Sequence, residues 1–377
     1  MNKRLFFLLS LSTLMIFVGC KDPYDMPPSS VDDSYLVVEG YLSANSPTTI
    51  KLSKTFKLDD TARVRPELMA SVAVESKNGS LFSLSSVGNG IYQIEQLPLQ
   101  TNDQYRLHIR TINNKEYYSE YIDYKPTPAI DSISWRRVDK GVQVFANTSD
   151  PQNNTRYYRW DYDETWEFHS PFLSNFDYVN NQIVTRDQNL NISVCWQSST
   201  STNILLGSSA KLARDVIVEA PLTLIPNRSW MLSVKYSILV RQYALNERAY
   251  QYWQNMMKNS EKIGSIFDPQ PTELKGNIYA ASDPKEIVIG YISAGTVEEK
   301  RHFIDRRQVP NWGYGHGCFE EIVANKKDSL EDVFGDGAFE PINEAVTPTG
   351  EQGYSYSATD CVDCRLKGVN VRPPFWQ

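Results

Sequence analysis

Acidic side chains recur at alternate positions of one predicted strand, residues 156–168, with a spacing suited to acid–base chemistry. Asp161, Asp163 and Glu167 fall on one face of this strand, on the same side as Arg159. A pair of carboxylates at a fixed separation can hydrolyse a glycosidic bond, one as the acid and the other as the base or nucleophile. A solvated strand face explains the pattern more simply. A glycan-directed envelope hydrolase is therefore an alternative and not the leading hypothesis.

The other face of this strand carries aromatic side chains. Trp160, Tyr162 and Trp166 alternate with the carboxylates, and their flat rings are candidates for stacking on a ligand such as a sugar ring. The core of a β-sheet needs the same alternation of apolar side chains, which makes core packing the favoured interpretation.

No catalytic motif accompanies these residues in the sequence. The four histidines are scattered without a His-Glu-x-x-His pair, and the Gly-x-Ser-x-Gly and phosphate-binding loop patterns are missing. We assign no catalytic residue, no metal site and no non-covalent cofactor. We therefore expect a protein without enzymatic activity.

Four cysteines beyond residue 20 are candidates for disulfide bonds. They are Cys195, Cys318, Cys361 and Cys364. In an exported protein an even number of cysteines favours two disulfides, and we prefer a bridge from Cys318 to Cys361 or Cys364. Two alternatives stay open, a redox-active pair at 361–364 and a zinc site that Cys318 and His316 would complete.

The N-terminal segment predicts export and lipidation. A basic start and an apolar run at 5–17 lead to the small residues Val18 and Gly19, which precede Cys20. We expect residues 1–19 to be cleaved as a signal peptide and Cys20 to carry a covalent lipid that holds the protein on a membrane. The run is short for a membrane-spanning helix, so an uncleaved anchor is the weaker alternative.

Residues 20–33 are polar and rich in proline, which predicts a tether between the lipid and the folded chain. Asp22 and Asp25 lie just behind the lipidated cysteine, as in the signals that send some lipoproteins to the cell surface. We expect an outer-membrane location, with the cell surface slightly favoured over the periplasmic face. The formal net charge of −7 argues against a nucleic-acid partner.

A period-two pattern of apolar residues begins at Tyr35 and predicts a mainly β protein. Short strands recur over residues 34–125, and Asn78-Gly79 marks a hairpin between two of them. This spacing is typical of a small sandwich of the immunoglobulin or transthyretin type. A proline pair at 126–128 then predicts a boundary.

Residues 128–377 predict a larger β-rich domain with one prominent helix. The clearest strand, residues 229–241, leads into a helix at about 246–263, which Asn246 can cap. Ala249, Trp253 and Met256 fall on one face of that helix, and Gly264 can end it.

Several ordered motifs resemble one family over nearly the whole mature chain. They are the lipidation motif with residues 21–25, and residues 36–42, 48–53, 236–245, 250–253, 264–271, 276–278, 290–294, 361–364 and 373–376. The sequence resembles the Bacteroidota outer-membrane lipoproteins catalogued as domain of unknown function 4249 (DUF4249). The resemblance implies a companion of a TonB-dependent outer-membrane receptor, in nutrient capture or envelope assembly, and it brings no catalytic residues.

We therefore expect a lipid-anchored, non-enzymatic accessory or binding subunit next to a TonB-dependent transporter. Its lipid would restrict it to the membrane plane, and its strands would present loops or an aromatic face to a small-molecule or glycan ligand. The alternatives are the glycan-directed hydrolase and a purely structural envelope protein.

Overall fold

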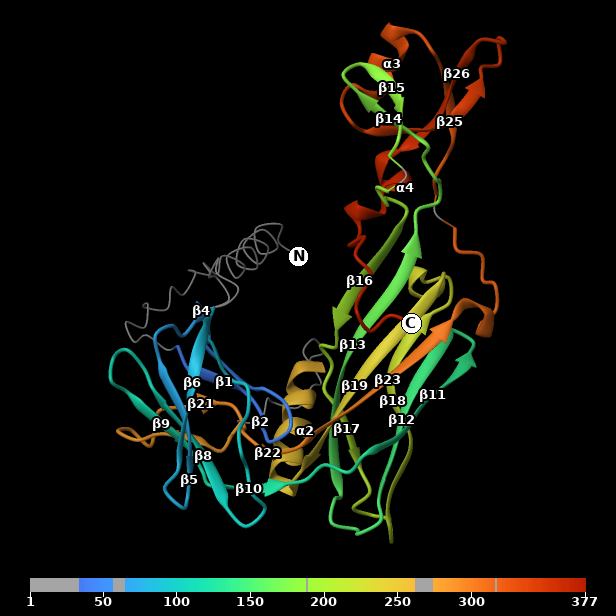
Figure 1. Ribbon diagram of the computed structural model, residues 1–377. Coiled ribbons are helices and arrows are strands. Elements are labelled where there is room, and N and C mark those ends of the chain that lie inside the picture. The colour runs from blue at the N-terminus through green and yellow to red at the C-terminus, as the bar shows by residue number, and fades with distance from the viewer. Residues whose placement is uncertain (1–33, 57–64, 188, 262–273, 316) are drawn as a thin grey trace, which may run out of the picture. The chain divides into compact units, whose positions relative to one another are not determined.

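The computed structural model describes residues 34–56, 65–187, 189–261, 274–315 and 317–377 (Figure 1). The predicted signal peptide, Cys20 and the tether at 20–33 lie outside these residues, as do His316 and Gly264. No helix in the described ranges is both long and apolar enough to cross a membrane.

The described chain is mostly β, as the alternation of apolar residues predicts. Its largest set of hydrogen-bonded strands contains β1 Leu36–Gly40, β2 Leu42–Ser43, β3 Thr48–Lys54, β4 Arg65–Pro66, β5 Ser71–Ser76, β6 Leu81–Gly88, β7 Ile91–Ile94, β8 Gln104–Arg110, β9 Glu116–Ser119, β10 Ile122–Lys125, β20 Ile278–Ala280, β21 Val288–Ile289 and β22 Ala294–Gly295. The main path runs β2-β22-β10-β8-β5-β6-β7-β3-β1-β21. Asn78 and Gly79 form the predicted turn between β5 and β6, where Val72 lies opposite Leu84.

Residues 278–295 return to this N-terminal set of strands from late in the sequence. β21 runs parallel to β1, and β22 runs parallel to both β2 and β10. The N-terminal strands are therefore not completed within 34–125, the range that the sequence predicts for the first domain. The division of the chain into domains and the type of sandwich stay predictions.

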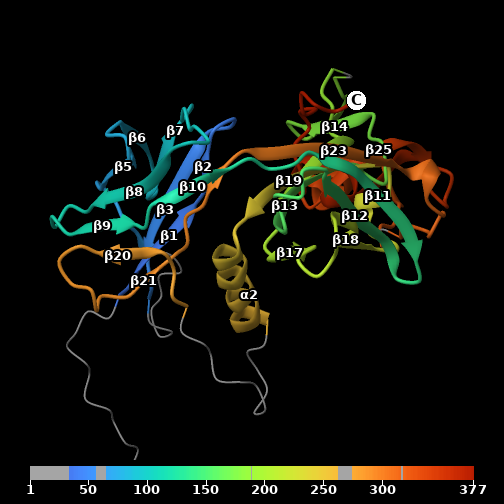
Figure 2. The ribbon, with the colours of Figure 1, turned by 90° about the horizontal axis from the view of Figure 1, so that it is seen from below.

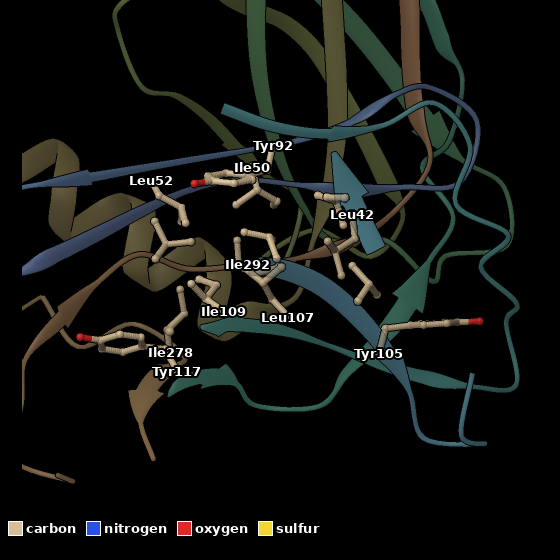
Figure 3. Close-up of a cluster of buried hydrophobic side chains, with 14 of the residues drawn as sticks. Leu42, Ile50, Leu52, Tyr92, Tyr105, Leu107, Ile109, Tyr117, Ile278 and Ile292 are labelled. Carbon is tan, nitrogen blue, oxygen red and sulfur yellow. The ribbon is translucent and has the colours of Figure 1, made fainter. Parts of the chain in front are cut away.

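The N-terminal strands enclose a core of aliphatic and tyrosine side chains (Figure 3). Ile50 and Leu52 from β3 and Leu107 and Ile109 from β8 are fully buried in it. Ile292, which follows β21, is also fully buried in this cluster, so the late strands contribute to the core as well as to the sheet.

A second group of strands forms two sheets that share one core. The three-stranded sheet contains β11 Ile130–Val138, β12 Gly141–Asp150 and β18 Asp215–Pro226, and the five-stranded sheet contains β13 Tyr157–His169, β16 Val194–Thr200, β17 Leu205–Ser208, β19 Lys235–Leu245 and β23 Val297–Asp305. Val144 from β12, Trp160 from β13, Tyr236 from β19 and Ile304 from β23 are all buried in this core.

The strand predicted at 229–241 begins later than the alternation indicates. Trp230 and Leu232 lie in a short 3-10 helix, η2 (Trp230–Leu232), and β19 starts at Lys235. The Ser229 hydroxyl accepts a hydrogen bond from the Met231 amide, which favours the helical turn over an extended chain. The prediction for 229–234 is therefore wrong.

Helix α2, Glu247–Glu261, follows β19 directly (Figure 2). The Asn246 side chain accepts a hydrogen bond from the Ala249 amide at 2.7 Å, so the predicted cap is confirmed. Ala249 is fully buried, and Trp253 and Met256 pack against the same small cluster.

The remaining elements follow β13 and β23. They are β14 Phe176–Val179, β15 Gln182–Thr185, η3 Arg306–Gln308, β24 Glu321–Ala324, α3 Lys327–Phe334, β25 Phe339–Val346, β26 Gln352–Ala358, α4 Thr359–Val362 and η4 Cys364–Leu366. β24, β26 and β25 form a three-stranded sheet, and β14 pairs with β15.

The four cysteines form two disulfides, Cys195–Cys364 and Cys318–Cys361. The second is one of the two bridges preferred from the sequence. The first joins β16 of the five-stranded sheet to η4 across 169 residues of sequence. All four thiols are oxidised in these bridges, so the described residues offer no cysteine thiolate to a zinc site and no free dithiol pair at 361–364.

The double substitution Cys195→Ser with Cys364→Ser should lower the free energy of unfolding by about 2–5 kcal/mol, because the bridge closes a long loop. Urea denaturation under non-reducing conditions measures this difference. Exposed Ser208→Ala in β17 is a control that should change little. An unchanged midpoint in the double variant would show that the bridge does not hold the C-terminal segment.

Candidate functional site

The outer face of the five-stranded sheet carries the acidic residues that the sequence singles out. β13, β19 and β23 lie side by side there, although they come from three separate stretches of the chain (Figure 1, green, yellow and orange). In this register Arg241 of β19 lies opposite Asp161 of β13 on one side and Glu299 of β23 on the other. The alternation of the strands therefore places their charges together on one surface.

Arg241 joins two of the three predicted carboxylates. Its Nε donates to Asp161 at 2.6 Å and its Nη1 donates to Asp163 at 2.6 Å. Burial alone would raise the pKa of Asp163, but hydrogen bonds from Arg241 and Thr200 hold it below the usual value. Asp163 is thus kept ionised and hydrogen-bonded, which is the opposite of what a general acid requires.

Glu167 lies at the far end of β13 with different partners. Its carboxylate is 2.9 Å from Nε2 of His169 and accepts a hydrogen bond from the indole N–H of Trp376 at 2.9 Å. Trp376 is 5% exposed and packs edge-on against Trp196 and Phe303. The carboxylate of Glu167 therefore binds Trp376, near the C-terminus, to the sheet.

The sequence did not single out Trp376 as a partner of this face. Trp376 is part of the family motif at 373–376, but no local pattern links it to Glu167, because the two residues are far apart in the chain. Lys235 completes the attachment, since its ammonium donates to the carbonyl of Gln377 at 2.5 Å.

Among the residues that the structure describes, two carboxyl groups have a raised pKa, those of Glu298 and Glu340, and neither lies beside Asp161 and Asp163 on this face. Burial raises the pKa of Glu298, which points to the opposite side of β23 from Glu299. Burial also raises the pKa of Glu340, which lies in β25 of another sheet and forms an ion pair with Arg186.

The candidate stacking aromatics lie on the inner face of β13. Trp160 is 1% exposed, and its indole N–H donates to the buried Gln242 side chain at 2.8 Å. Tyr162 is 5% exposed, and Trp166 is half-buried against the same core. The rings of Trp160 and Tyr162 therefore have no face open to a ligand, and their position matches the core-packing interpretation.

A pocket of about 410 Å³ opens over the same outer face of the sheet. Its walls come from the loops and strands at 39–49, from α2 and from the sheet, and its charged lining residues are Glu39, Arg159, Arg241 and Glu299. Three aromatic side chains complete it: Tyr41 between β1 and β2, Tyr243 of β19 and Trp253 of α2. We define this as the Arg159 pocket.

Arg159 packs against two of these rings. Its guanidinium carbon is 4.3 Å from the ring centre of Tyr243 and 4.6 Å from that of Trp253. Tyr41 contacts Tyr243 edge-on, and burial raises the pKa of the Tyr41 hydroxyl far above its usual value. The aromatic wall is thus a different set of residues from the one that the sequence proposes.

The loop at the mouth of the pocket is tied to the sheet through Asn45. Its side chain both donates to the carbonyl of Val297 and accepts from the amide of Val297, each at 2.9 Å. The hydroxyls of Ser43 and Ser46, both lining residues, are 2.7 Å apart. Hydrogen bonds therefore fix this wall of the pocket in position.

No group of three or more histidine, cysteine, aspartate or glutamate side chains within the described ranges is placed to hold a metal ion. The chemistry that the site offers is hydrogen bonding and ion pairing from fixed planar side chains, next to aromatic rings.

The change Asp163→Asn should lower the free energy of unfolding by about 1 kcal/mol at pH 7, since it removes a charged hydrogen bond at a partly exposed site. The pKa of folded Asp163 lies below its unfolded value, so its contribution is complete above pH of about 4 and disappears as the pH falls through the lowered pKa. Urea denaturation at pH 7 and near pH 3 should show this difference shrinking.

Asp139→Asn, in an exposed turn, is the matched control and should have little effect at either pH. If Asp163→Asn instead stabilised the protein near neutral pH, the carboxyl would have a raised pKa and the hydrolase alternative would gain support.

A comparison with family models gives one match, and it covers residues 21–301. The matching family is described as a domain of unknown function (DUF4249). A search of curated proteins finds no match. The matched range includes all of β1 to β22 and most of the outer face of the five-stranded sheet. The chain therefore belongs to the DUF4249 family.

Proposed function

We propose that this protein is a lipid-anchored, non-enzymatic accessory or binding subunit that works next to a TonB-dependent transporter of the outer membrane. The observation that carries the proposal is Cys20, which follows an apolar run and the small residues Val18 and Gly19. A diacylated thiol at this position anchors the mature chain without a membrane-spanning helix.

The outer face of the five-stranded sheet supports binding over hydrolysis. Arg241 hydrogen-bonds both Asp161 and Asp163, and Glu167 is bonded to Trp376. A retaining or inverting glycosidase needs one carboxyl with a raised pKa next to a second, ionised one. Here the pKa of Asp163 is lowered, so the geometry favours a fixed recognition surface.

A lipid anchor would increase the effective concentration of such a surface beside a receptor in the same membrane. The tether at 20–33 would then set how far the folded chain reaches from the bilayer. A ligand held in the Arg159 pocket would remain close to the transporter without any chemical change.

The variant Cys20→Ala should release the protein from the membrane fraction, because no lipid can be attached. Metabolic labelling with a radioactive or alkyne-bearing fatty acid, followed by fractionation, measures both effects. Pro27→Ala in the tether is the control and should keep the label and the membrane location. If Cys20→Ala stayed in the membrane fraction in full, the anchor would lie elsewhere.

The full-length, lipidated protein should co-purify with a β-barrel receptor in a fixed ratio from native outer membranes. Mild-detergent affinity purification and mass spectrometry measure that ratio. The Cys20→Ala variant, expressed at the same level, should recover far less receptor because the two no longer share a membrane. Recovery of the lipidated protein alone would contradict the accessory role and leave the anchor intact.

A further inference from the structure

We propose that the Arg159 pocket binds a small organic carboxylate, with the guanidinium of Arg159 as its anchor. This inference rests on the binding role proposed above and names the class of ligand. It follows from a difference between the two arginines that line the same pocket.

Arg241 is hydrogen-bonded to two carboxylates, whereas Arg159 has one longer ion pair, with a carboxylate that it shares with Arg241. Arg241 makes two hydrogen bonds of 2.6 Å, to Asp161 and Asp163. The nearest carboxylate oxygen to Arg159 belongs to Asp161, at 3.6 Å, and that residue already accepts from Arg241. In the ranges that the structure describes, the Arg159 guanidinium makes no hydrogen bond.

The Arg159 guanidinium is held in place and largely removed from solvent. The side chain of Arg159 is 20% exposed, and the rings of Tyr243 and Trp253 pack against its guanidinium. Contact with the rings leaves the edge of the guanidinium, where its N–H groups lie, as the part that can form hydrogen bonds. A carboxylate fits that edge with two parallel N–H···O bonds, and such charged pairs are the stronger class of hydrogen bond.

Other lining residues would select the rest of the ligand. Glu299 lies across from Arg241, while Glu39 is paired with Lys51 at 3.1 Å. Together with the lining hydroxyls, these carboxylates accept hydrogen bonds from hydroxyl or ammonium groups. The ligand is therefore a carboxylate that also carries such donors, as a sugar acid or an amino acid does.

The volume of about 410 Å³ lies toward the lower end of the range for small-molecule sites. The pocket therefore suits a single sugar or amino-acid unit better than a long chain.

Isothermal titration of the full-length protein in detergent tests this proposal with two pairs of probes. D-Glucuronate is compared with D-glucose, and L-serine with L-serinamide, at concentrations up to about 10 mM. Members of each pair differ chiefly in the carboxylate. At least one carboxylate should bind with a Kd below about 1 mM, and at least tenfold more tightly than its counterpart that lacks the carboxylate.

Substitutions of Arg159 should weaken the binding of the carboxylate to different degrees. Arg159→Gln should lose at least tenfold in affinity, and Arg159→Lys should lose less, because it keeps the charge without the planar fork. Arg136→Gln is the matched control, since Arg136 also lies over an aromatic ring, Phe145, and pairs with Glu219 outside the pocket. It should leave the affinity unchanged. Thermal unfolding confirms that each variant is folded.

Binding of glucuronate identifies a sugar acid as the class, and binding of serine identifies an amino acid. The proposal is overturned if neither carboxylate binds, if glucose and serinamide bind as tightly, or if folded Arg159→Gln and Arg159→Lys both keep full affinity. The titration needs neither the transporter nor the membrane. If the titration shows no binding, the results on lipidation and receptor co-purification still stand. If those two experiments fail, the result of the titration still stands.

Discussion

The long antiparallel pairing of β13 with β19 is the constraint on which the site depends. It runs from Tyr157 opposite Leu245 to Glu167 opposite Lys235 without a break in register. Because side chains alternate between the faces of a strand, this one register buries Trp160 and brings the partners of Arg241 within hydrogen-bond distance on the outside. A slip by one residue would expose the aromatic row and bury the charges.

The outer face that results has two ends with different roles. At one end the charged groups of the Arg159 pocket lie beside the rings of Tyr243 and Trp253. At the other end the ring of Trp376 covers the sheet, and Arg301 packs over the ring of Phe375 at 3.5 Å. The disulfide between Cys195 and Cys364 holds the chain that leads to this second end. The protein itself therefore covers one end of the face and leaves the other as a pocket.

Local patterns in the sequence predict much of this structure. The mainly β fold follows from alternation, the turn at Asn78-Gly79 follows from its left-handed residue preference, and the cap at Asn246 follows from its side-chain chemistry. Each of these depends on a few neighbouring residues. Alternation also places Trp160 on one face of β13, and of the two interpretations of that face, core packing and ligand stacking, the favoured one is core packing.

Contacts between segments that are far apart in the chain could not be predicted from the sequence. Nothing local in residues 278–295 indicates that β21 and β22 pair in parallel with the first strands. Likewise, the acidic pattern on β13 suggests paired catalytic carboxylates until Arg241, about 80 residues later, is placed between them. That pairing changes the expected chemistry of the face, because the hydrogen bond from Arg241 helps to hold the pKa of Asp163 below its usual value.

A double-mutant cycle on Arg241→Gln and Asp163→Asn, measured by urea denaturation at pH 7, tests this bridge most directly. If the arginine fixes the carboxylates as described, the two substitutions should be coupled by about 1 kcal/mol or more, because either change removes the same hydrogen bond. Effects that add to within about 0.3 kcal/mol would contradict the account, because the two side chains would then be independent and Asp163 would be free for other chemistry.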